Sequence, residues 1–282
     1  MKERSIGFRR NIDLVVKALS GLAALTGIAF LVWILIVIVV KGLDAISPEF
    51  FTQLPAPPMM PGGGLGNAIL GTGIITTLAT LIGVPIGLMA GIFLSEFGRD
   101  SFLAELVRYA TNILMGTPSI IIGVFVYVIL VAPMGGFSGY SGAVALAIIM
   151  LPVVARTTED MLNLVPDAVR ESALALGAPR WKATVGVVFR AARTGLVTGS
   201  LLAVARVSGE TAPLLFTALN SPFWPRSLSE PTANLPVTIF NYAMSPYVDW
   251  QAMAWGSSLL ITTVILGITV LVRTVLGRRK TT

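Results

Sequence analysis

Residues 19–40 read LSGLAALTGIAFLVWILIVIVV, a run of 22 residues without a charged side chain. A helix needs about 20 mostly apolar residues to cross the hydrocarbon core of a bilayer. The whole chain shares this character, since 55% of its 282 residues are hydrophobic, 12% are charged and the mean hydropathy is +0.83. Soluble domains carry roughly a quarter charged residues. The sequence therefore predicts an all-α integral membrane protein and argues against an ordinary globular enzyme domain.

Five further apolar stretches follow the first one along the chain. The expected spans are residues 19–40, 67–95, 109–132, 141–155, 194–219 and 250–272. Six spans place both ends of the chain on the same side of the membrane. Four of them contain an internal proline, which removes an intrahelical hydrogen bond and should kink the helix; these prolines are Pro85, Pro118, Pro152 and Pro213.

The positive charges predict which side that is. Lys and Arg concentrate in cytoplasmic segments near the ends of spans. All but three of the 20 Lys and Arg residues lie at the two chain ends or in the segments after spans two and four, the exceptions being Lys41, Arg206 and Arg226. Both termini are therefore expected in the cytoplasm. The net charge of +6 then follows from topology, and no nucleic-acid partner is expected.

Residue types also limit the chemistry. The chain has no cysteine and no histidine, which removes disulfides, thiol nucleophiles, imidazole bases and the commonest zinc ligands. It also lacks the Gly-x-x-x-x-Gly-Lys-Ser/Thr loop that cradles nucleotide phosphates. We expect no catalytic residue and no metal site.

The chain is expected to divide into four parts. Residues 1–45 form a basic cytoplasmic tail and a peripheral span, residues 46–66 form a Pro- and Gly-rich outer loop, residues 67–275 form a compact bundle of five spans, and residues 276–282 form a cytoplasmic tail. Within the bundle, Gly83, Gly87 and Gly91 recur at four-residue spacing. Such a stripe lets a neighbouring helix pack closely in lipid, so these glycines are interpreted as packing residues.

Residues 205–213, ARVSGETAP, place two ionisable groups inside the fifth span. Arg206 follows Arg193 by 13 residues, about 20 Å along a helix and close to the membrane centre. Four residues apart on a helix, Arg206 and Glu210 would share one face. They form either a structural ion pair or an anion site in which the guanidinium binds phosphate or sulfate oxygens. Glu210 would then accept a hydrogen bond from a protonated anion such as hydrogen phosphate.

Residues 156–193 are too polar to cross the membrane and are expected to fold as a helix–turn–helix coupling segment on the cytoplasmic face. Pro166 and Asp167 begin the first helix, and Gly177 with Pro179 ends it. A second short helix is expected from about residue 180 to 192. This segment is either a docking element for a partner or an amphipathic element on the lipid surface.

Glu171-Ser172-Ala173, three further residues and Gly177 resemble the Glu-Ala-Ala loop of the permease subunits of ATP-binding-cassette importers. Ser172 replaces the second residue of that family motif, and Phe189-Arg190 stands where many members have Leu-Pro. Other stretches resemble the phosphate branch of the same family, and the likeness covers about residues 65–275; they are residues 116–121, 156–159, 205–218, 233–237 and 244–246.

The resemblance implies a type I importer permease fold in the bacterial inner membrane. It implies a second, similar permease subunit, two ATPase subunits that bind ATP and Mg, and an extracytoplasmic phosphate-binding protein as partners. No cofactor is expected in this chain. The implied ATPase contacts are Glu171, Ser172, Ala173 and Gly177, and the implied lining of the substrate path is Arg206 and Glu210, with Arg156 as a further member. For Arg156, the positive-inside bias alone is an alternative explanation.

Two rival functions stay open. The first is a permease of the same architecture for another oxyanion, such as sulfate or a phosphonate. The second is a secondary transporter or channel without an ATPase, in which Glu210 would carry a proton. A membrane enzyme is disfavoured, because no pair of carboxylates is expected at membrane depth.

Overall fold

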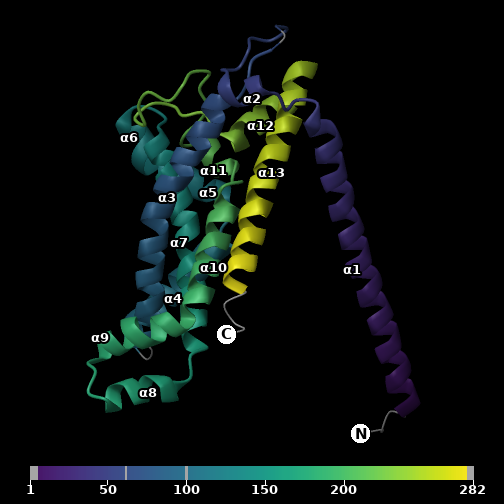
Figure 1. Ribbon diagram of the computed structural model, residues 1–282. Coiled ribbons are helices and arrows are strands. Elements are labelled where there is room, and N and C mark those ends of the chain that lie inside the picture. The colour runs from purple at the N-terminus through teal and green to yellow at the C-terminus, as the bar shows by residue number, and fades with distance from the viewer. Residues whose placement is uncertain (1–5, 61, 99–100, 278–282) are drawn as a thin grey trace.

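The computed structural model describes residues 6–60, 62–98 and 101–277, and its regular elements in these ranges are all helical (Figure 1). This confirms the predicted all-α class. The long elements are α1 (Ile6–Leu43), α3 (Gly66–Ile92), α4 (Phe102–Gly116), α7 (Gly139–Asn163), α10 (Phe189–Val207) and α13 (Val248–Gly277). The short ones are α2 (Pro48–Thr52), α5 (Ser119–Val126), α6 (Ala132–Met134), α8 (Asp167–Ala175), α9 (Arg180–Ala183), α11 (Ala212–Leu215) and α12 (Leu235–Ala243), with π-helical turns η1 (Phe93–Phe97), η2 (Tyr127–Val131) and η3 (Thr184–Val188).

Five helical stretches are long and apolar enough to cross a membrane: Arg10–Leu43, Gly66–Phe97, Gly139–Asn163, Arg180–Val207 and Val248–Leu271. A sixth consists of two parts, Phe102–Gly116 and Ser119–Met134, bent by 105° relative to each other. The sequence predicts one span over residues 109–132 with a kink at Pro118, and the structure goes further by breaking the helix at this proline. Pro118 disfavours helical geometry at the residue before it, and Thr117 accordingly has extended dihedrals of φ −79° and ψ 130°.

The fifth span also differs from the prediction. Residues 180–207 form one helical stretch through α9, η3 and α10, whereas we expected a short helix ending near residue 192 and a span from 194 to 219. The π-helical turn η3 lies inside this stretch and does not end the helix. At the other end, the helix ends at Val207, because Gly209 and Pro213 favour a break there.

α3 and α7 form the centre of the bundle, and the glycine stripe of α3 faces α7. A Cβ atom placed on Gly87 would lie 2.7 Å from Cβ of Val154, and one on Gly91 would overlap Thr158. Gly83, Gly87 and Gly91 are all buried. Since real Cβ atoms do not approach so closely, larger residues would force the two helices apart.

α1 diverges from the bundle, and meets α13 only near one end of the molecule (Figure 1). There Gly42 lies against Trp255 and Leu259 of α13. Apolar side chains are exposed along most of α1, for example those of Leu25 and Trp33. Such a surface requires lipid or another protein chain around it.

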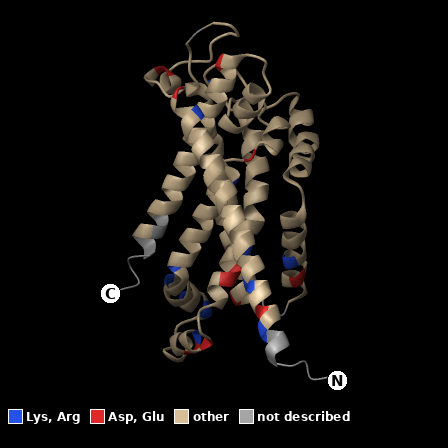
Figure 2. Cartoon of the chain, turned by 90° about the vertical axis from the view of Figure 1, so that its right-hand side faces the viewer, with Lys and Arg blue, Asp and Glu red and all other residues tan. Residues whose placement is uncertain are grey.

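α1 begins and α13 ends at the end of the bundle that carries α8 and α9, which we call the basic end (Figure 1). Lys and Arg gather at this end (Figure 2). Its cytoplasmic orientation stays a prediction. The predicted cytoplasmic charges Lys2, Arg4, Arg99, Arg278, Arg279 and Lys280 lie outside the described residues.

The opposite end carries α2, α6 and α12 (Figure 1). Residues 46–66 and 220–249, which lie between expected spans, each contain a short helix, α2 and α12. α12 begins at an N-cap, since the Asn234 side chain accepts a hydrogen bond of 3.1 Å from the Val237 N–H and Pro236 lies in the first turn. Asn followed by a proline in the first turn is an ordinary helix start.

Candidate translocation path and coupling segment

Arg206 and Glu210 do not share a helix face. α10 ends at Val207 and α11 begins at Ala212, so Glu210 lies in the link between two helices. The predicted i,i+4 relation needs a continuous helix, and the break removes it. No salt bridge joins the two side chains among those found in the described ranges.

The packing of α10 on α7 gives the depth of Arg206. Gly199 of α10 lies against the Thr157 side chain of α7, and Arg206 is seven residues further on, about 10 Å at 1.5 Å per residue. The α10–α11 junction lies within the height of the bundle, below α12 (Figure 1). The Arg206 side chain is exposed in this single chain, and Glu210 is half-buried. Because a charge at membrane depth is unstable against lipid, this face requires a water-filled path or a covering subunit.

The motif around Arg206 lies beside the other broken span. Pro213 of α11 packs on Gly123 of α5, where an added Cβ would lie 2.6 Å from the proline Cα. Val207 and Leu214 on either side of Glu210 are buried in the core. Non-helical backbone at membrane depth is tolerated only where it is buried in protein or lines a water-filled cavity. The two helix breaks therefore lie side by side, packed against the core of the bundle.

Arg156 lies nearer the basic end and is already paired on its own helix. Its guanidinium is 3.6 Å from Glu159 Oε2 and 3.4 Å from Asp160 Oδ1, and 47% of the side chain is exposed. Since Thr157 is level with Gly199, Arg156 is about two helical turns from Arg206 along the bundle. The structure does not bring Arg156 and Arg206 into one cluster.

A polar network at the basic end was missed by the sequence reasoning. Arg108 of α4 donates from Nε to Glu159 Oε1 at 2.7 Å and from Nη2 to the Leu94 carbonyl at 3.1 Å. Glu159 is buried. The arginine therefore joins α4 to α7 and to η1.

The second arginine of this network lies in α8. Arg170 donates from Nη2 to Glu96 Oε1 at 2.8 Å and to the Leu162 carbonyl at 2.7 Å, and from Nη1 to the Val165 carbonyl. The side chains of Arg170 and Glu96 are 13% and 6% exposed. The Ser95 hydroxyl extends the network, because it lies 3.0 Å from Asn163 Oδ1.

The coupling segment has the helix that its sequence predicts. α8 begins at Asp167 and ends at Ala175, as the Pro166-Asp167 start and the glycine stop indicate. Gly177 has a φ of +83°, the left-handed conformation that glycine adopts most easily. Glu171 and Ser172 are exposed, whereas Ala173 is buried. α8 and its C-cap thus present Glu171 and Ser172 to the medium at the basic end, together with the exposed apolar side chains of Leu174 and Leu176.

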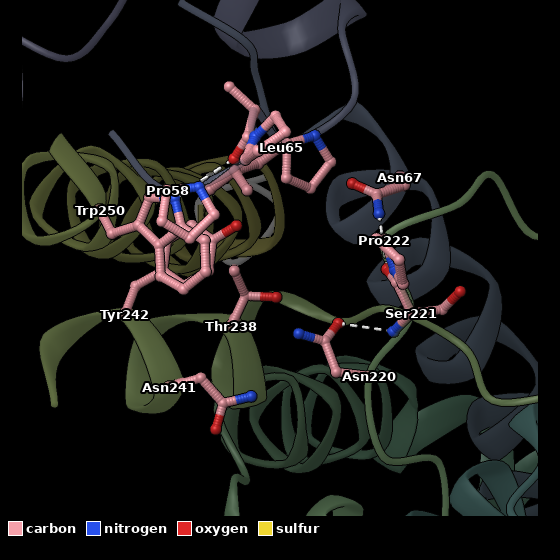
Figure 3. Close-up of a pocket in the computed structure, with 13 residues that line it drawn as sticks. Pro58, Leu65, Asn67, Asn220, Ser221, Pro222, Thr238, Asn241, Tyr242 and Trp250 are labelled. Atoms are coloured by element: carbon pink, nitrogen blue, oxygen red, sulfur yellow. Dashed lines mark hydrogen bonds between the residues drawn. The ribbon is translucent and has the colours of Figure 1, made fainter. Parts of the chain in front are cut away.

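A cavity of about 410 Å³ lies at the opposite end between the outer loop, α12 and α13 (Figure 3). Asn67 is buried, and its Nδ2 donates to the Ser221 carbonyl at 2.8 Å. Tyr242 stacks on Trp250 with ring centroids 4.5 Å apart, and burial raises the pKa of Tyr242 to about 12. The described residues that line this cavity are all uncharged. Within the described ranges, no group of three or more Asp and Glu residues could hold a metal ion.

The family described as the inner membrane component of binding-protein-dependent transport systems matches residues 83–279, and the chain belongs to this family. It is therefore a multi-pass inner-membrane permease component. The chain is 48% identical over 279 residues to the phosphate transport system permease protein PstA of Yersinia pestis, covering 99% of this chain and 95% of that one. It is 46% identical over 274 residues to the protein of the same name from Haemophilus influenzae, covering 97% and 96%.

Likeness extends to an archaeal protein and to solved structures. A probable phosphate transport system permease protein PstA of Methanocaldococcus jannaschii is 38% identical over 262 residues, covering 93% of this chain and 92% of that one. An inward-facing structure of the MetNI methionine ABC transporter matches with a TM-score of 0.60 at 20% identity, covering 76% of this chain and 93% of that one. At this identity the structure shows the fold alone. The predicted ABC importer permease fold is confirmed.

Proposed function

We propose that this chain is the membrane-spanning permease subunit of an ATP-driven importer of inorganic phosphate and forms half of its translocation pathway. The observation that carries the proposal is the identity of 46–48% over nearly the full chain to proteins named as phosphate transport permeases. The matched length takes in nearly the whole chain, 99% and 97% of it in these two cases. The chain itself hydrolyses no ATP.

The exposed charge of Arg206 supports a second permease subunit of similar fold. A guanidinium at membrane depth cannot face lipid at low cost, and in this chain no described acidic group forms a salt bridge with it. A partner that covers this face would enclose a polar path between the two subunits. The free apolar length of α1 offers further surface for such a partner.

The exposed face of α8 supports a role as this chain's contact with the ATPase part of the assembly, whose two subunits would bind ATP and Mg. Glu171 and Ser172 are exposed there, and Gly177 sets the turn that follows. We assign Glu171, Ser172, Ala173 and Gly177 to this coupling surface. The basic end then faces the cytoplasm, and the opposite end meets an extracytoplasmic phosphate-binding protein.

The substrate path would use Arg206, Glu210 and, nearer the basic end, Arg156. The planar guanidinium of Arg206 matches two oxygens of a tetrahedral oxyanion. Glu210, held in the link after α10, would accept a hydrogen bond from the hydroxyl of hydrogen phosphate. Sulfate at neutral pH has no such proton, so the carboxylate would favour phosphate and repel sulfate.

Oxyanion competition tests this function. The complete assembly is reconstituted in vesicles, and ATP-dependent uptake of radiolabelled phosphate is measured with excess sulfate or a phosphonate. We expect unlabelled phosphate to compete and sulfate not to compete, and Glu210→Gln to raise the inhibition by sulfate. Uptake of labelled sulfate in preference to phosphate would assign the chain to another oxyanion, and unchanged sulfate rejection by Glu210→Gln would contradict the role of the carboxylate.

A further inference from the structure

The attachment of α8 to the bundle is mainly polar. Ala173 is the buried residue of α8 among those described, and Val169 is a partly buried contact with the cluster of Leu162, Val165 and Val188. Leu174 is 45% exposed. Against this small apolar contact, Arg170 reaches from α8 into the bundle and is almost fully enclosed.

The bonds of Arg170 hold three separate elements together. Its Nε and Nη2 both face the Glu96 carboxylate, at 3.0 and 2.8 Å from Oε1. Glu96 belongs to η1, the end of the second span, and the carbonyls of Leu162 and Val165 belong to the end of α7 and its following turn. A planar fork with several fixed acceptors permits little rotation or sliding.

The network continues from η1 towards the broken span. Leu94, two residues before Glu96, accepts from Arg108 of α4. α4 ends at Gly116, directly before the 105° bend. The same π-helical turn is therefore bonded to α8 on one side and to the lower half of the broken span on the other.

We propose that Arg170 is the positioning residue that makes α8, η1 and the end of α7 one rigid unit, so that displacement of α8 is transmitted to the spans. This rests on the proposed function, because it presumes that α8 receives the motion of an ATPase. Neither the family motif nor the glycine turn includes this arginine. Its role is mechanical: without the Glu96–Arg170 bonds, α8 would move relative to the spans and would not carry them with it.

The test measures phosphate transported per ATP hydrolysed in vesicles with the complete assembly. We expect Arg170→Gln to lower this ratio at least tenfold while ATP hydrolysis continues, and Arg170→Lys, which keeps the charge but loses the fork, to lower it less. Arg190→Gln is the matched control, because Arg190 is exposed on α10 near the same end. A parental ratio in Arg170→Gln would overturn the inference. If Arg170→Gln fails to assemble, the Arg170→Lys variant is used instead. A parental ratio of phosphate transported to ATP hydrolysed in Arg170→Lys would then overturn the inference.

A covalent bridge in place of the Glu96–Arg170 bonds tests whether the link between α8 and η1 matters in itself, apart from any loss of protein stability. The chain has no cysteine, so the double variant Glu96→Cys, Arg170→Cys can be bridged by a bifunctional methanethiosulfonate reagent. Bridging should restore the ratio towards the parental value, and either single variant treated alike should stay uncoupled. Bridging that abolishes residual uptake would show that α8 must separate from η1, against the proposal. If the parent assembly itself shows no ATP-dependent phosphate uptake, the proposed function is refuted and the inference about Arg170 is not the cause.

Discussion

Arg206 is a charged residue that lies at membrane depth and is exposed in the single chain. It lies in the last turn of α10, directly before a helix break. The junction of α10 with α11 lies within the height of the bundle (Figure 1). A hydrogen bond to a charged group contributes about 1.5–3 kcal/mol. An anion that crosses this position would lose at least one such bond if the guanidinium were removed.

We therefore predict that Arg206→Gln lowers ATP-dependent phosphate uptake by about 10- to 100-fold, while assembly and basal ATP hydrolysis survive. The control is Arg190→Gln, since Arg190 is exposed on the same helix but lies near the basic end, away from the helix break. Uptake is measured in vesicles with radiolabelled phosphate. Unchanged uptake by Arg206→Gln would make the charge structural and remove it from the path.

For single residues, the sequence predicts which ones are candidates for the site better than it predicts which side chains form ion pairs. The motif at residues 205–213 points to Arg206 and Glu210, but their supposed shared face depends on a helix that ends three residues too early. The pairs that do form join residues far apart in the chain: Glu96 with Arg170, 74 residues apart, and Arg108 with Glu159, 51 apart. The sequence shows that charged residues lie near the basic end. Which of them form ion pairs depends on how the helices pack, and the sequence alone does not give this.

At the scale of elements, the α3–α7 contact is set by glycine. Gly73 on the same helix has open space around it, whereas a Cβ on Gly91 would overlap Thr158. The two glycines therefore differ only in their surroundings, and they offer a matched comparison.

Gly91→Ala should destabilise the folded chain by about 1–3 kcal/mol through overpacking. Gly73→Ala should be neutral or stabilise it by up to about 1 kcal/mol, because alanine favours the helix over glycine. Thermal unfolding of the detergent-solubilised protein, followed by size-exclusion chromatography, measures both. Equal melting temperatures for the two variants would contradict close packing at Gly91.

The exposed face of α8 makes a second prediction for an element. Glu171→Lys should reduce the amount of copurifying ATPase at least tenfold, since it reverses a charge on the proposed docking surface. Glu105→Lys makes the same change on the exposed face of α4 and should leave the ATPase bound. Quantifying the ATPase after affinity purification of this chain measures the effect. Retention of the ATPase by the Glu171→Lys protein would favour a role for α8 at the lipid surface.

Element boundaries were predictable where a local signal decides them. Pro166-Asp167 and Gly177 bound α8 through capping and turn chemistry, which neighbouring residues alone determine. Pro118 shows the opposite case. A proline inside an apolar run predicts a kink, but whether the helix bends slightly or breaks by 105° depends on the packing of α5 against α11.

For the whole molecule, the apolar pattern predicts how many helices cross the membrane and not where each one lies. The divergence of α1 illustrates this, because its uncharged stretch over residues 19–40 carries no stripe that specifies a neighbour. Orientation is likewise a prediction from charge.

Labelling of introduced cysteines tests the orientation, since the chain has none of its own. A membrane-impermeant thiol reagent should label Ser229→Cys, at the opposite end, from outside intact spheroplasts. Ala175→Cys, in α8, should be labelled only after the membrane is permeabilised. The reverse labelling pattern would show that the basic end faces outward and that the predicted orientation is wrong.

The central claim is that this chain moves phosphate inward only when ATPase subunits drive it. The most direct measurement is uptake of radiolabelled phosphate by vesicles that contain the complete assembly with its phosphate-binding protein, against vesicles that lack only the ATPases. We predict accumulation against a gradient that requires ATP and is absent without the ATPases. Concentrative uptake by this chain without ATP or ATPase would contradict the account and assign the protein to secondary transporters.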